Sequence, residues 1–160
     1  MSFSKKVRWI IYPPIIVVIV YLVFTQKQDY RDPSQQDYDS RIELETRALT
    51  AQTSDQIHIR LQIKNRGKKS WRSVGEYPCF LSYHLYLRDN YRTVSFENQR
   101  FPLPQTVEPG ETIDMEITLQ APIEAKSYII VFDMVREGQA WFHEYGSRKG
   151  IIRLDVTERK

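Results

Sequence analysis

Residues 57–64 read IHIRLQIK, and this stretch decides the fold. Apolar side chains occupy every second position and polar side chains lie between them, a period of two that is typical of a strand with one buried face. The same alternation recurs at 81–88 and at 113–119. Residues 128–135, YIIVFDMV, are apolar on both faces, which predicts a central strand covered on both sides.

Shorter runs complete the pattern. Ile42 and Leu44, residues 140–144 and residues 151–156 predict three further strands. Breakers lie between most of the runs, and no stretch after residue 30 keeps a helical period. The breakers are Asn65-Arg66-Gly67, Asp89-Asn90, Glu108-Pro109-Gly110, Ala121-Pro122, Glu137-Gly138 and Gly146. About seven to nine short strands at this spacing predict an all-β, two-sheet antiparallel sandwich over residues 41–160.

The N-terminal segment is of a different kind. Residues 9–24 read WIIYPPIIVVIVYLVF without a charge, and at about 1.5 Å per residue a helix of this length spans roughly 24 Å, enough to cross a bilayer with local thinning. We expect an uncleaved transmembrane α-helix, because no A-x-A-like cleavage site follows; a secretory signal peptide is the alternative. The side chains expected in the membrane and at its interfaces are Trp9, Tyr12, Ile16, Ile19, Tyr21 and Phe24.

Charge predicts the orientation of this anchor. Lys5, Lys6 and Arg8 precede the apolar run, and no acid does. The positive-inside rule therefore places residues 1–8 in the cytoplasm. Residues 25–40 are polar and are expected to be a linker. We thus expect a bacterial cytoplasmic-membrane protein whose C-terminal domain is periplasmic or extracellular.

Composition limits the function classes. The chain has 23 Lys and Arg against 20 Asp and Glu, and without the three N-terminal cations the remainder is balanced, which disfavours nucleic-acid binding. Cys79 is the only cysteine, so an internal disulfide is excluded. Because Phe80 and Leu81 follow it, we expect this thiol to be buried rather than reactive.

The sequence shows no motif of a hydrolase, a zinc protease or a nucleotide-binding enzyme. We expect no catalytic residue, no cofactor and no metal, since the three histidines lie on separate strands without a fixed spacing and would meet only by a coincidence of folding. Two of them, His58 and His84, lie opposite apolar faces and are expected to be solvent-exposed. The acids Asp133, Glu137 and Glu144 are expected to be solvated.

Aromatic residues are more numerous than alternating core positions require. Such rings serve either as core and sheet-edge packing or as contacts to sugars and protein partners. Trp141 and Phe142 are adjacent, so in a strand they point to opposite sides and one of them is expected to face outward.

Residues 41–157 resemble the immunoglobulin-like C-terminal domain of Wzt-type O-antigen ABC transporter proteins, which also occurs in bacterial glycosyltransferases and methyltransferases. The pieces that carry the resemblance are Asn65, Gly67, Trp71, Pro102-Leu103-Pro104, Pro109-Gly110-Glu111, Ala121-Pro122, Asp133 to Val135, Glu137-Gly138 and Trp141-Phe142. The sequence departs from the family at Ala125-Lys126-Ser127, where the family has Pro-Gly. The resemblance implies an immunoglobulin-like sandwich. It also implies that Tyr86, His84, Trp141 and Tyr145 are candidate contacts to a polysaccharide or a partner.

Two functions follow as hypotheses. In the first, the chain is a non-enzymatic subunit of a larger membrane complex, photosynthetic or respiratory for instance, whose partners are lipid and other subunits. In the second, it is an anchored carbohydrate-binding module for envelope polysaccharide. The second requires the candidate aromatic residues to line an open groove, whereas the first does not.

Overall fold

The computed structural model describes residues 35–159. The expected anchor at 9–24, with its six named side chains, and most of the linker lie outside the described residues. Within the described part of the chain, no helix has both the length and the apolar character that crossing a bilayer requires.

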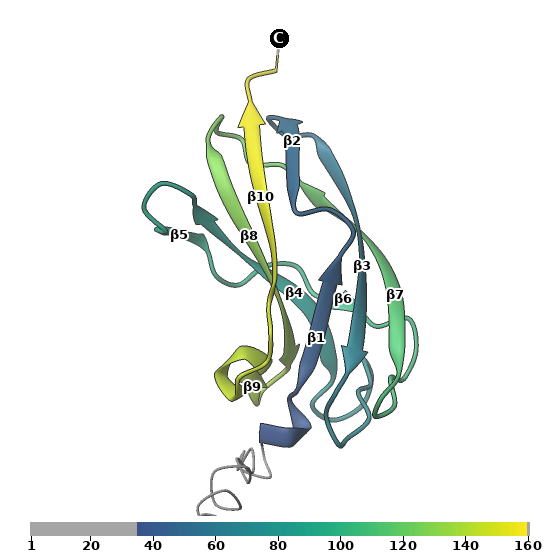
Figure 1. The fold of residues 1–160 in the computed structure, drawn as a ribbon. Helices are drawn as coiled ribbons and strands as arrows, with labels where there is room; N and C mark the ends of the chain where they lie inside the picture. Colours follow the sequence, from purple (N-terminus) through teal and green to yellow (C-terminus); the bar gives the residue numbers. More distant parts are fainter. Residues whose placement is uncertain (1–34, 160) are drawn as a thin grey trace, which may run out of the picture. The chain divides into compact units, whose positions relative to one another are not determined.

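The described residues form two β-sheets (Figure 1). One sheet has the order β1-β3-β7, and the other has the order β2-β10-β8-β4-β5, with β6 paired to β4 and β9 paired to β8. All pairs are antiparallel except β2 with β10. The elements are η1 (Gln35–Asp37), β1 (Ser40–Leu44), β2 (Ala48–Gln52), β3 (Gln56–Asn65), β4 (Cys79–Leu87), β5 (Thr93–Ser95), β6 (Phe101–Pro102), β7 (Thr112–Gln120), β8 (Ser127–Arg136), β9 (Ala140–Trp141), η2 (Phe142–Tyr145) and β10 (Gly150–Thr157).

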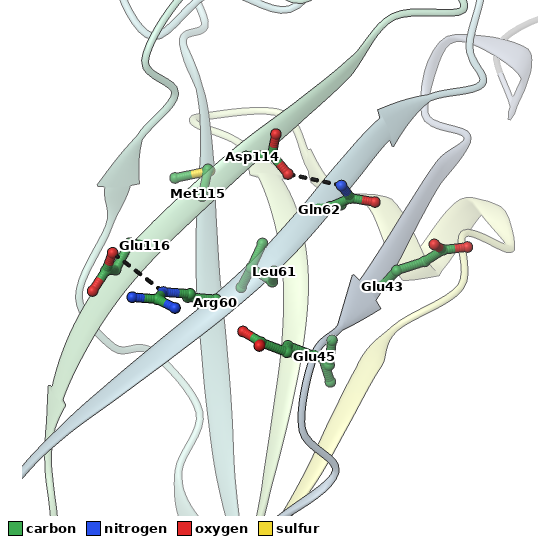
Figure 2. Close-up of a pocket in the computed structure, with 9 residues that line it drawn as sticks. Glu43, Glu45, Arg60, Leu61, Gln62, Asp114, Met115 and Glu116 are labelled. Carbon is green, nitrogen blue, oxygen red and sulfur yellow. Dashed lines mark hydrogen bonds and ion pairs between the residues drawn. The ribbon is translucent and has the colours of Figure 1, made fainter.

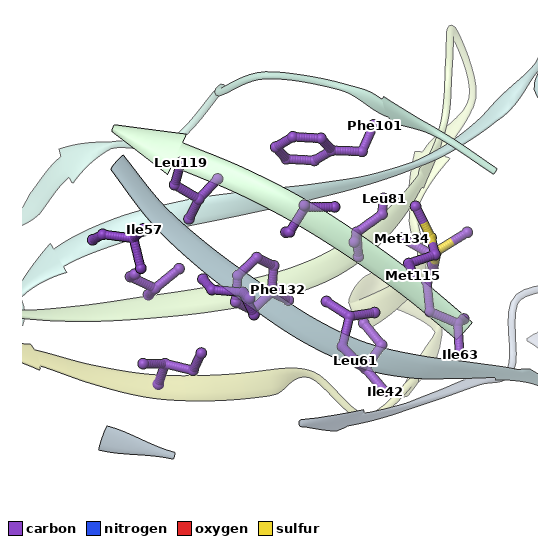
Figure 3. Close-up of a cluster of buried hydrophobic side chains, with 14 of the residues drawn as sticks. Ile42, Ile57, Leu61, Ile63, Leu81, Phe101, Met115, Leu119, Phe132 and Met134 are labelled. Carbon is purple, nitrogen blue, oxygen red and sulfur yellow. The ribbon is translucent and has the colours of Figure 1, made fainter. Parts of the chain in front are cut away.

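The core lies between the two sheets, where alternate residues of facing strands meet (Figure 3). Ile57, Ile59, Leu61 and Ile63 of β3 are all buried, as the period of two predicts. Facing them, the large sheet contributes side chains that include Leu81, Tyr128, Ile130, Phe132, Met134, Ile152 and Leu154. The all-β antiparallel sandwich expected from the sequence is therefore confirmed.

The long strands lie where the sequence predicts them, with one correction near residue 140. Strand β8 is central in its sheet and is buried on both faces between Ile130 and Val135, as its apolar run predicts. The expected strand at 140–144 is instead the short β9 followed by the 3₁₀ helix η2. The expectation that Trp141 or Phe142 faces outward is wrong, since both are buried. The physical reason is that Phe142 begins the helix η2, so the two side chains do not alternate as they would in a strand.

The chain changes sheets between β1 and β2. Strand β1 pairs with β3 in the small sheet, and β2 pairs with β10 in the large one (Figure 1). Ser40 and Ser147 tie the start of β1 to the segment before β10: Ser40 N donates to Ser147 Oγ at 2.9 Å and Ser147 Oγ donates to the Ser40 carbonyl at 3.0 Å. As a result, β1 and β10 lie next to each other at the border between the two sheets, and one of the hollows described below lies between them.

Candidate functional site

The large sheet carries a second cluster of buried residues on the face turned away from the core. Its members are the alternate residues of β4 and β8 that do not enter the core, including Ser82, His84, Val131 and Asp133. The antiparallel register sets Ser82 opposite Asp133 and His84 opposite Val131. Three polar side chains therefore gather on a sheet face that usually meets solvent.

This cluster is covered by the chain itself. Phe96, in the segment after β5, stacks on the His84 ring at 4.1 Å between centroids, and Trp141 lies 4.4 Å from the same ring. As a result His84 is 0% exposed and Trp141 is 8% exposed. The expectation that His84 is solvent-exposed is wrong, because Phe96 and Trp141, from segments far from β4 in the sequence or outside its pattern, cover the ring. His58, by contrast, is exposed on β3 as expected.

His84 is held in one tautomer. Its Nδ1 lies 2.5 Å from the carbonyl oxygen of Phe96, and since a carbonyl only accepts, Nδ1 carries the proton. The other nitrogen, Nε2, is buried and has no hydrogen-bond partner among the described residues. Burial lowers the pKa of His84, the hydrogen bond to the Phe96 carbonyl opposes this, and the charges of Lys149 and Arg100 add to the lowering. In the neutral ring with the proton on Nδ1, the lone pair on Nε2 therefore has no partner among the described residues.

Asp133 is a fully buried carboxylate beside His84. Its Oδ1 accepts from the Met134 amide at 2.8 Å, and its Oδ2 accepts from His143 Nδ1 at 2.5 Å and from the His143 amide at 3.3 Å. Burial raises the pKa of Asp133, and the hydrogen bonds and charge of His143 oppose this rise. The expectation that Asp133 is solvated is wrong, and η2 is what brings His143 to it.

Arg100 fastens the covering segment to the sheet. Its guanidinium donates to Ser82 Oγ at 3.1 Å and to the Asn98 carbonyl at 2.9 Å, and it forms ion pairs with Glu97 at 3.0 Å and with Glu137. The group also lies 4.9 Å from the Trp141 ring centroid, a cation–π distance. The cluster is thus a closed polar and aromatic assembly.

The structure brings together three of the four residues predicted as sugar or partner contacts. Tyr86, His84 and Trp141 belong to the covered cluster, with the Tyr86 and His84 rings 6.4 Å apart. Tyr145 stacks instead on Tyr38, with 4.5 Å between ring centroids. His84 and Trp141, being buried, present no open ring face to a sugar, and the role of all four residues as contacts stays a prediction.

One surface hollow, of about 630 Å³, lies over the small sheet (Figure 2). Glu43, Glu45, Asp114 and Glu116 surround it, with Leu44, Leu61 and Met115 among its lining residues. Arg60 pairs with Glu116 at 3.5 Å, and Gln62 Nε2 donates to Asp114 at 2.8 Å. The four carboxylates are exposed to solvent.

A second hollow, of about 800 Å³, lies on the other side of β1, between β1 and β10. We call it the basic groove. Its five cations are all exposed, and its only acid, Glu43, is already paired with Arg41 at 2.6 Å. The cations are Arg41, Arg47, Arg148, Lys149 and Arg153. A groove of one sign of charge attracts groups of the opposite sign.

Sequence reasoning missed the basic groove and the approach of His143 to His84 and Asp133. The five cations come from three separate segments, and only the change of sheet between β1 and β2 sets them side by side. His84 and Asp133 share an outward position on predicted strands, but the register that brings them close is not encoded in either strand alone. The Arg148-Lys149 pair was the one local signal for the groove.

No protein-family model and no curated protein matches this chain. Several solved structures are similar to it. The CARDB domain of a Pyrococcus furiosus protein, described as a complex with di-metal ions, is 12% identical over 76% of this chain and 94% of that one, with a TM-score of 0.47.

The C-terminal domain of wzt is 10% identical over 76% of this chain and 72% of that one, with a TM-score of 0.43. A chitin-binding domain from Burkholderia pseudomallei is 10% identical over 71% and 57%, with a TM-score of 0.38. The Wzt domain, which the sequence resembles, is thus among the similar structures. Likenesses at this level carry no argument about a ligand or a partner.

Proposed function

We propose that this chain is a non-enzymatic, single-pass accessory subunit of a larger bacterial membrane complex, photosynthetic or respiratory for instance, and that its sandwich mediates protein–protein contacts on the outer side of the membrane. The basic groove is the observation that carries the proposal. Arg47, Arg148, Lys149 and Arg153 have no ion-pair partner among the described residues. An acidic surface of another subunit would supply the missing counter-charges.

The character of the groove favours a protein as its occupant. It is concave, and Ile42, Leu44 and Ile151 line it together with the cations. Guanidinium groups beside aliphatic surface are typical of protein interfaces, where Arg is enriched and pairs with carboxylates in a two-pronged geometry. Ile151 is 52% exposed, so it offers an apolar contact next to the cations.

The strand order supports an immunoglobulin-like class for the sandwich. In that class strands A, B and E of one sheet face strands G, F and C of the other. The orders β1-β3-β7 and β10-β8-β4 correspond to these strands in sequence. The proposed membrane anchor is inferred from the apolar residues 9–24 and the charges that flank them. In the proposal it contacts the membrane complex within the bilayer, in addition to the contact made by the basic groove.

The alternative, an anchored carbohydrate-binding module, has less support from the geometry. It needs aromatic faces open to a sugar ring, and the predicted rings of His84 and Trp141 are buried under Phe96 and Arg100. Retention of the full chain on an envelope-polysaccharide column, with loss of retention in Tyr86→Ala, would favour this alternative.

Carbodiimide coupling in native membranes tests the main proposal, because it joins a lysine amine to a carboxylate that is in direct contact with it. We expect Lys149 of the full chain to couple to an acidic side chain of another subunit, and the adduct to be absent from Lys149→Arg. The double variant Arg148→Glu/Lys149→Glu should lose at least about 90% of the copurified subunit, since close interfacial charge pairs are worth more than 1.4 kcal/mol.

The matched control is Lys64→Glu/Arg92→Glu, which makes the same change of charge at exposed positions outside the groove. This variant should keep the partner. Retention of the partner by the groove variant, or equal losses in both, would contradict the proposal.

A further inference from the structure

We infer that His84, Asp133 and His143 form a binding site for one divalent transition-metal cation, for which Zn²⁺ is the simplest probe. One ligand atom from each residue lies within 4.8 Å of the others. Two imidazole nitrogens and a carboxylate oxygen are a ligand set that Zn²⁺ takes in proteins, with a water as the fourth ligand. Bond lengths of about 2.0–2.2 Å place tetrahedral ligand atoms roughly 3.3 Å apart, so small side-chain rotations complete the site.

The orphaned nitrogen of His84 is the observation that points to a ligand. A buried polar atom without a partner is costly, and Nε2 of His84 is such an atom in a fully buried side chain. The proton on Nδ1 is committed to the Phe96 carbonyl. Metal-binding histidines are commonly held in this way: a backbone carbonyl accepts the proton of one ring nitrogen and leaves the other nitrogen free to bind the metal.

The surroundings complete the resemblance to a metal site. Asp133 is the one buried acid among the described residues, and its orientation is fixed by the Met134 amide. Phe96 and Trp141 form an apolar shell over the His84 ring. The His143 side chain keeps 24% of its surface exposed, which leaves a path from solvent to the ligand atoms.

Two nearby cations oppose a bound metal ion, and the structure weakens both effects. Arg100 is paired with Glu97 and Glu137, so most of its charge is compensated. Lys149 is exposed and therefore screened by solvent and salt. Asp133 is itself one of the proposed ligands, and because it is buried its attraction for a cation is screened less than the repulsion by exposed Lys149.

Binding of Zn²⁺ to the full chain tests the inference. The 160-residue chain, without a polyhistidine tag, is solubilised in mild detergent, stripped with a chelator and titrated with zinc chloride in a calorimeter. We expect one equivalent to bind and the unfolding temperature to rise, because a ligand that binds only the folded state stabilises it. With Co²⁺ in place of Zn²⁺, a visible absorption spectrum of a four-coordinate site should appear.

Three variants decide between a built site and surface binding. His143→Gln should weaken binding by at least about 10-fold, and its partial exposure makes it the variant least harmful to folding. His84→Gln should have the same effect, provided that circular dichroism shows an intact sandwich. The matched control is His58→Gln, on exposed β3, which should bind like the wild type. Absence of Zn²⁺ binding, or equal weakening in all three variants, would overturn the inference.

Discussion

Asn65 shows how one buried polar residue joins two loops, the one between β3 and β4 and the one between β6 and β7. Its Nδ2 donates to the carbonyls of Lys69 and Val107, both at 2.9 Å, and its Oδ1 accepts from the Gly67 amide at 2.9 Å. Asn65 is 0% exposed and its backbone bonds Glu111 and Gly110. The side chain therefore bonds three backbone groups, and the Val107 carbonyl also accepts from the Trp71 amide at 3.0 Å.

Asn65→Ala is expected to lower the free energy of unfolding by about 2–4 kcal/mol, because buried donors and acceptors left unpaired cost more than the net value of the bonds. Thermal unfolding of the full chain, followed by circular dichroism in the β region, measures this. The control Gln62→Ala removes an exposed bond to Asp114 and should change stability by less than about 0.5 kcal/mol. Equal shifts in the two variants would contradict the account of Asn65.

The sequence predicted the local role of single residues better than it predicted which residues they contact. The asparagine–glycine turn and the burial of Cys79 were visible in the sequence, since each rests on local pattern, and Cys79 is indeed 1% exposed. The burial of His84 was not visible. It depends on contacts with Phe96 and Trp141, which are 12 or more residues away in the sequence and which the pattern of β4 does not reveal.

At the scale of elements, the strands with strict alternation were predictable and the short ones were not. β3 and β7 bury one face each and show it in their sequences. Strand β2 reads ALTAQ, and none of its residues is fully buried, although Leu49 and Ala51 pack against the core. Its alternation of apolar and polar side chains is therefore weak. The strand forms because β10 offers it a free edge, a tertiary effect that local pattern cannot reveal.

Gly150 allows β10 to lie close to β1, because it has no side chain. A Cβ at this position would lie 2.7 Å from Ile42 Cγ2 and 3.2 Å from Leu44 Cδ1. Ile42 cannot retract readily, since its branched side chain is stiff and buried. Gly150→Ala should therefore destabilise the sandwich by about 1–3 kcal/mol through overpacking.

A double-mutant cycle with Ile42→Ala checks that the clash is the cause. Removing the Ile42 methyl groups makes room for the new Cβ, so the double variant should be more stable than the sum of the single changes predicts, by at least about 0.5 kcal/mol. Urea titration of the four proteins gives the coupling energy. Strict additivity would show that the loss at Gly150 has another origin.

At the scale of the whole molecule, β1 separates an acidic hollow from a basic one. The acidic hollow lies on one side of β1 and the basic groove on the other, and Glu43 and Leu44 line both. The charge balance of the sequence concealed this, because equal totals of acids and bases are compatible with strong local separation. A partner that docks here would be oriented as well as bound, since the two hollows call for opposite charges.

The orientation of the chain in the membrane is the remaining whole-molecule prediction. Three cations before the apolar run predict a cytoplasmic N-terminus and an external sandwich. Cysteine labelling can test this in whole cells, because Cys79 is buried and its burial raises the pKa of the thiol, so the native background of reactive thiolate is low. Ile123 is 81% exposed and Ser2 precedes the cations, which makes them suitable positions for new thiols.

In spheroplasts treated with a membrane-impermeant maleimide, we expect Ile123→Cys to be labelled at once and Ser2→Cys to be labelled only after the membrane is opened with detergent. The physical reason is the cost of moving three cations through the hydrocarbon core, about 2.5–3.5 kcal/mol for each at its centre. Labelling in the opposite order would place the basic groove in the cytoplasm, and the groove would then have to find its acidic partner there. Labelling of both thiols without detergent would mean that residues 9–24 do not span the membrane at all.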